Sequence, residues 1–135
     1  ENYDDMSTLR VDRIAHITVL NERRKPLREI KGYQQQRTFN VSQYVKEHIY
    51  MFGGESITVT FKAKRSIVNQ ILDWFDGNVE FTNITADNVV CRVRVNHDAF
   101  KYWALQYMQS VKVLTPASLV TEVKAAIEEG LHQYS

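Results

Sequence analysis

The chain from about residue 55 onward switches repeatedly between the two-residue period of strands and the longer period of helices. Apolar residues at every second position predict strands with one buried face. Four such runs are present, at Ile57–Ala63, Val79–Ile84, Val89–Val95 and Ser110–Leu114. Between and after these runs, apolar residues spaced three or four apart predict three helices.

Helix boundaries are marked by residues that favour caps and stops. Ser66 and Asn96 precede two of the predicted helices, and their short polar side chains can accept hydrogen bonds from the first helical amides. We expect the first helix to end at Asp76-Gly77. The terminal helix should open at Thr115-Pro116 and stop at Gly130.

The predicted order of elements is β-α-β-β-α-β-α, which indicates an α+β protein. The first six elements form the ferredoxin-like split βαβ pattern, in which two helices cover one face of an antiparallel sheet. Right-handed crossovers place the first and third strands at the centre. The fold should therefore carry one extra C-terminal helix and leave one sheet face uncovered.

The N-terminal part also alternates. Leu9-Arg10-Val11-Asp12-Arg13-Ile14 is followed by a second alternating run, so residues 8–20 predict a strand. In a strand, Arg13 would share a face with apolar residues and would need a fixed partner or an anion. Arg10 and Asp12 would lie together on the other face and contact each other, which makes Arg13 the better anion ligand.

Asn40 is a suitable N-cap for a helix over Val41–Tyr50. Its predicted apolar face consists of Val41, Tyr44, Val45 and Ile49. The pair Gly53-Gly54 should then end this element before the first strand of the sheet.

Several of these segments resemble a known family. Leu9–Ile14 is similar to the closing motif of the WYL domain, a small Sm-like β-barrel of bacterial transcription regulators. Phe39–Tyr44, Val111–Pro116 and a last helix ending near Tyr134 are similar to WCX, the extension that follows WYL domains. The Trp-Tyr-Leu tripeptide that names the family is absent, and so is any N-terminal winged helix.

This resemblance implies that residues 1–36 are the last WYL strand or hairpin with a connector, and that residues 37–135 are a WCX domain. It also implies that Arg10 and Arg13 face the ligand-binding surface of the barrel. The chain would then be the regulatory region of a WYL regulator. Operator DNA would be contacted only through a winged helix outside this chain.

The uncovered sheet face carries the other candidate ligand-binding residues, which are basic: Lys62, Lys64, Arg92 and Arg94. Thr58 and Thr60 accompany them, Lys112 joins from the last strand, and Glu80 is the one acid placed there. Such a sheet resembles RNA-binding ferredoxin-like modules but lacks stacking aromatics. The alternative is a solvated face whose charges provide only solubility.

Composition excludes several classes. The 135 residues carry a formal net charge of +1, so general basicity gives no case for nucleic acid. The single cysteine, Cys91, excludes an internal disulfide and suits a reducing cytoplasm. Its four histidines lack metal-ligand spacing, and no motif indicates catalysis. We therefore expect a cytoplasmic, non-enzymatic protein without cofactor, metal or membrane contact.

Together these features predict a homodimeric regulatory region that binds single-stranded nucleic acid or a nucleotide-like effector. The dimer would form by exchange or edge pairing of the strand over Leu9–Leu20. Trp74 and Tyr102 lie off the main apolar faces, which favours a subunit interface, whereas Cys91 should be inert core. Two alternatives stay open: a pure oligomerisation module without a ligand, and a ferredoxin-like domain that binds a small molecule.

Overall fold

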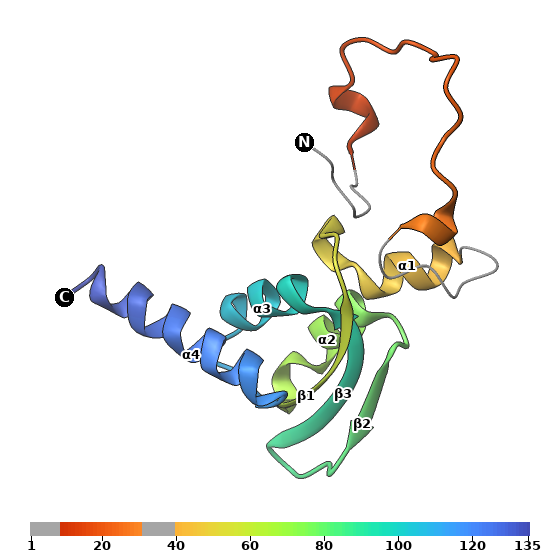
Figure 1. Ribbon diagram of the computed structural model, residues 1–135. Helices are drawn as coiled ribbons and strands as arrows, with labels where there is room; N and C mark the ends of the chain where they lie inside the picture. Colours follow the sequence, from red (N-terminus) through yellow and green to blue (C-terminus); the bar gives the residue numbers. More distant parts are fainter. Residues whose placement is uncertain (1–8, 31–39) are drawn as a thin grey trace.

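The computed structural model describes residues 9–30 and 40–135 (Figure 1). An antiparallel four-stranded sheet has the order β2-β3-β1-β4. The strands are β1 (Ser56–Lys64), β2 (Val79–Thr82), β3 (Asn88–Asn96) and β4 (Val111–Thr115). The first and third strands are central, as the crossover rule predicts.

The helices are α1 (Val41–Glu47), α2 (Val68–Phe75), α3 (His97–Gln106) and α4 (Ala117–His132). Figure 1 shows α2 and α3 on one side of the sheet and α1 on the other. The long α4 packs against α3 and β4 and adds Leu119 and Val123 to the core. The predicted α+β fold with an extra C-terminal helix is confirmed.

The core lies between the sheet and α2–α3 and is centred on aromatic rings. Phe61 from β1, Phe75 from α2, and Phe100 and Trp103 from α3 are fully buried. Their ring centroids lie 4.9 to 6.2 Å apart, the range in which aromatic pairs attract each other. Cys91 lies in this core, where burial raises the pKa of its thiol to about 11. It is inert core, as predicted.

Two of the three predicted N-caps are confirmed. Asn40 accepts a hydrogen bond from the Gln43 amide, and Asn96 accepts one from the Ala99 amide, each at 3.0 Å. The Ser66 cap is wrong, because β1 leads into a 3₁₀ turn over Arg65–Ile67 and the Val68 amide bonds the Arg65 carbonyl. A backbone carbonyl thus satisfies the amide that a side-chain cap would have served.

Gly130 does not end the last helix, which continues to His132. A glycine stops a helix when it takes the left-handed conformation, and Gly130 does not take it. In contrast, α2 ends as predicted, with Asp76 and Gly77 both at positive φ. None of the helices in the described part of the chain is long and apolar enough to cross a bilayer.

The strand predicted over residues 8–20 is wrong across the described positions. Val11–Arg13 form a 3₁₀ turn, and residues 14–20 follow without regular structure. No strand pairs with this segment in the described part of the chain, so its backbone groups have no ladder to join. Its apolar side chains stay in solvent, with Val19 91% exposed. The predicted boundary at residue 36 lies outside the described residues.

Candidate anion-binding face

The sheet surface opposite α2 and α3 is called the open face below. On β1 and β3, this face carries the mostly polar residues that alternate with the buried apolar ones. Thr58 lies opposite Arg94, Thr60 opposite Arg92, and Lys62 opposite Lys112 of β4. The structure therefore brings four of the six predicted ligand-binding residues to one surface, namely Lys62, Lys64, Arg92 and Arg94.

The basic residues on the open face lie close enough to act together. Directly opposed residues on neighbouring strands have Cβ atoms about 4.5–5.5 Å apart, which applies to Lys62 and Lys112. Arg92 lies on the diagonal from Lys62, at about 7–8 Å. Lys64 follows Lys62 by two positions along β1, about 7 Å away. These side chains are exposed, so they can reach a common ligand.

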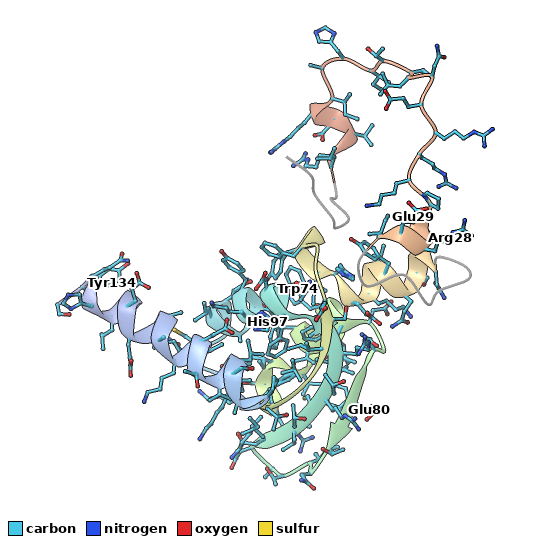
Figure 2. The ribbon with its side chains drawn as sticks, in the orientation of Figure 1. Arg28, Glu29, Trp74, Glu80, His97 and Tyr134 are labelled. Atoms are coloured by element: carbon cyan, nitrogen blue, oxygen red, sulfur yellow. The ribbon has the colours of Figure 1, made fainter. Side chains whose placement is uncertain are left out.

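Acidic groups neutralise little of this charge. Glu80 on β2 lies opposite Arg92 in the register, and Figure 2 shows it at the exposed edge of the sheet. In the described residues, no carboxylate lies within 4.0 Å of the cationic groups of Lys62, Lys64, Arg92 or Lys112. The positive potential of this surface is therefore available to an external anion.

Arg94 differs from the other cations, because α1 covers its end of the open face. Its Nε atom lies 3.4 Å from Oε1 of Glu47, a side chain only 13% exposed. The same carboxylate oxygen accepts a hydrogen bond from the side-chain Nε2 atom of Gln43 at 2.6 Å. Sequence patterns did not indicate Glu47. It lies on α1, and no local sequence signal encodes where that helix packs on the sheet.

Arg10 and Arg13 do not join the open face; their segment lies well away from the sheet (Figure 1). The predicted contact of Arg10 with Asp12 is confirmed, with Nε donating to Oδ1 at 2.9 Å. This bond lowers the pKa of Asp12 and raises the pKa of Arg10. The assignment of Arg10 and Arg13 to opposite strand faces is wrong, because the 3₁₀ turn replaces the strand.

The chain from α1 to β1 connects the two sides of the sheet. Its start is held by buried His48, whose Nδ1 and Nε2 lie 2.8 Å and 3.2 Å from the carbonyl oxygens of Tyr44 and Gly54. Its end is held by buried Asn96, which donates to the Gly53 carbonyl at 2.9 Å while capping α3. Sequence reasoning found only the cap, since the second bond spans 43 residues.

This connector also covers aromatic side chains of α2 and α3. Phe52 stacks on Tyr102 with centroids 5.2 Å apart, and Tyr50 lies 4.7 Å from the Trp74 ring. The Tyr50 hydroxyl donates to Gln106 at 2.6 Å. Trp74 and Tyr102 therefore have partners within the chain, which explains their positions off the main apolar faces. The predicted helix over Val41–Tyr50 ends early, at Glu47, because His48 leaves the helical conformation with φ −108° and ψ 57°.

A second charged cluster joins α3 to α4. His97, labelled in Figure 2, lies 2.9 Å from Asp98 and 3.2 Å from Glu122, and Lys101 bonds the second oxygen of Glu122 at 3.2 Å. The contacts of His97 and Lys101 with Glu122 tie α3 to α4. Among the residues that the structure describes, no group of three or more His, Cys, Asp or Glu side chains could hold a metal ion.

The chain matches the model of a known protein family. Residues 53–131, more than half of the chain, match the family model of the WCX domain. This range contains the whole sheet, α2, α3 and nearly all of α4. No curated protein matches the chain. The matched range includes the basic open face but neither Arg10 and Arg13 nor α1.

Proposed function

The chain belongs to the WCX domain family, and from this premise we propose that it is the regulatory region of a WYL-type bacterial transcription regulator. Its task would be to bind an anionic effector, single-stranded nucleic acid or a nucleotide-like molecule. One observation carries the proposal: unpaired lysine and arginine side chains gather on the open face of a rigid sheet. The proposal assigns binding to the chain and no reaction.

The two central strands supply the pre-organisation that such a site needs. β1 and β3 are paired along their whole length, so the backbones that carry Lys62, Lys64 and Arg92 have fixed spacing. When a ligand binds, conformational entropy is then lost only by the side chains, because the backbone is already ordered, and this favours affinity. The resemblance of Leu9–Ile14 to the WYL motif supports Arg13 as a separate anion ligand away from the open face, since Arg10 already holds Asp12.

The contact between Glu47 and Arg94 offers a route for the signal. An effector phosphate at Arg94 would compete with the Glu47 carboxylate for the same guanidinium. Release of Glu47 would weaken the hold of α1 on the sheet and change the orientation of the chain before it. Ligand binding could thereby bias DNA-binding domains that precede this region.

Titration with a labelled oligothymidylate at several salt concentrations tests the proposal. Arg92→Ala should weaken binding and lower the slope of log K against log salt by about 0.7, because one phosphate contact to a single strand is lost. Lys124→Ala is the matched control, since it removes one positive charge from exposed α4, away from the sheet. Equal binding by the wild type and a Lys62→Ala, Arg92→Ala double variant would contradict the proposal.

One observation favours a second function, a dimerisation module that binds no ligand. Ile127, Leu131 and Tyr134 follow one another at helical spacing along the C-terminal end of the chain and are exposed. Figure 2 shows Tyr134 beyond the C-terminal end of α4, away from the sheet. We propose that a homodimer, if formed, uses this stripe. Light scattering should then show a dimer that Leu131→Glu converts to monomer, whereas Leu20→Glu should leave it unchanged.

A further inference from the structure

The opposition of Lys62 and Lys112 is unusual for the open face. The other cross-strand neighbours there that include a basic residue combine an arginine with threonine or glutamate, or a lysine with an uncharged residue. Only Lys62 and Lys112 place like charges directly opposite each other among the registered pairs of the described sheet. Such a pair is destabilising, and an anion between the two ammonium groups would relieve the repulsion.

Hydroxyl and guanidinium donors surround this lysine pair. Thr60 precedes Lys62 by two positions on the same face, between Arg92 on β3 and Thr115 on β4. A threonine hydroxyl and a guanidinium both donate to phosphate oxygens, and arginine does so through two parallel bonds. Lysine adds a strong point charge with rotatable donors. Donors of these three kinds therefore occupy neighbouring positions on the same face of the sheet.

The strand positions of the open face offer no aromatic ring on which a base could stack. These positions are occupied by serine, threonine, lysine, arginine, glutamate, asparagine, valine and leucine, and none of the described ones is aromatic. The aromatic side chains of the sheet and of α2–α3 pack in the core or contact the connector, as Trp74 and Tyr102 do. Stacking on rings supplies about 1–3 kcal/mol per base in proteins that bind single strands through their bases. That contribution is absent from this surface.

We propose that Lys62, Lys112 and Arg92 form a phosphate subsite, and that the effector is recognised as a chain of phosphates without its bases. This inference rests on the proposed function and narrows its ligand class to a phosphodiester or polyphosphate backbone. Lys64 extends the subsite along β1. Affinity at this surface depends on the number of phosphates and on salt, and it is indifferent to base identity.

Two oligonucleotides of equal length test the inference, an oligothymidylate and an abasic strand with the same phosphates. Their dissociation constants for the full chain should agree within about threefold, because stacking on even one base would separate them by about fivefold or more. The Lys62→Ala, Lys112→Ala double variant should lower the salt slope by about 1.4 for both strands. The Lys101→Ala, Lys124→Ala variant, which removes the same charge from α3 and α4, should lower it less.

The outcomes separate this inference from the proposed function. Binding of the thymidylate about fivefold or more tighter than the abasic strand would overturn recognition through phosphates alone and leave the proposed function intact. If both strands bind equally well and the Lys62→Ala, Lys112→Ala variant binds them as tightly as the wild type, the phosphate contacts lie elsewhere. That result would overturn the subsite. Binding of neither strand would contradict the proposed function itself.

The thermal unfolding midpoint, measured without any nucleic acid, tests the lysine pair directly. Lys112→Gln keeps most of the side-chain length and removes the repulsion, so it should raise the Tm by about 1–4 °C at low salt. Inorganic tripolyphosphate should raise the Tm of the wild type and have a smaller effect on the variant. Lys124→Gln, which breaks a favourable pair with Glu128, should not raise the Tm. A Tm unchanged by Lys112→Gln and by tripolyphosphate would overturn the subsite.

Discussion

Two segments of this protein share an alternating pattern and have different structures. In β1, every second residue from Val59 to Ala63 is buried, and the strand is paired on both sides. The segment Leu9–Leu20 alternates nearly as well, yet forms a 3₁₀ turn and irregular chain with exposed apolar side chains. Alternation therefore makes a segment competent to be a strand. Neighbouring strands and a covered face decide whether it becomes one.

The charged residues of the two segments differ in the same way. Arg10 pairs with Asp12, two positions away, so the contact needs no tertiary structure. Lys62 meets Lys112 only because β1 and β4 are neighbours in the sheet. The first arrangement neutralises itself, and the second concentrates charge of one sign. The sheet is thus the part of the molecule that can create an anion site from residues distant in sequence.

The largest expected contrast concerns the core under β1. Phe61→Ala should lower the free energy of unfolding by about 3–5 kcal/mol, because it leaves a cavity among Phe75, Phe100 and Trp103. Ile17→Ala, in the N-terminal segment, should change it by less than about 0.5 kcal/mol. Chemical denaturation of both variants measures the difference. A large loss for Ile17→Ala would show that this segment packs against something in solution.

Asn96 should show a smaller effect, and it tests how firmly the connector belongs to the sheet. Asn96→Ala removes the α3 cap and leaves the Gly53 carbonyl without its side-chain donor. We expect a loss of about 2 kcal/mol in the free energy of unfolding. Asn69→Ala, at an exposed position of α2, is the control and should be nearly neutral. Equal effects would mean that the buried bonds of Asn96 do not tie the connector down.

The pH dependence of the free energy of unfolding tests the burial of the Cys91 thiol in β3, a property that the exposed side chains of Leu9–Leu20 lack. Burial raises the pKa of Cys91 from its ordinary value of 9.0 to about 11. The unfolded chain therefore releases the thiol proton first, and the free energy of unfolding should fall as the pH rises from about 9 to about 11. Cys91→Ala should lack this part of the decrease. Identical pH profiles for the two proteins would show that the thiol ionises equally well in the folded state.

The smallest expected effect belongs to the Arg10–Asp12 pair. Asp12→Asn removes a charged partner of Arg10, but both side chains are exposed and nothing packs on them. Because exposed pairs are screened by solvent, the thermal unfolding midpoint should not change measurably. Differential scanning calorimetry at low salt checks this. A lower midpoint would indicate that Leu9–Leu20 is structured in solution, for instance against a second chain.

The sequence by itself determined the fold of residues 56–132. Strand and helix periods differ, so the elements and their types could be identified one by one, and the crossover rule ordered the strands. Local contacts were predictable for the same reason: the caps at Asn40 and Asn96 and the Arg10–Asp12 pair all join residues two or three positions apart. The strand faces also followed, which placed Lys62, Lys64, Arg92 and Arg94 together on one surface.

Only the tertiary structure decided which of these features act together. The register that opposes Lys62 to Lys112 depends on how β4 aligns with β1, where the pairing shifts between Thr60 and Phe61. The Glu47–Arg94 contact depends on where α1 lies on the sheet. The failure of Leu9–Leu20 to form a strand depends on the absence of a pairing partner in the described chain. Each is set by residues distant in sequence, and local patterns carry no record of such neighbours.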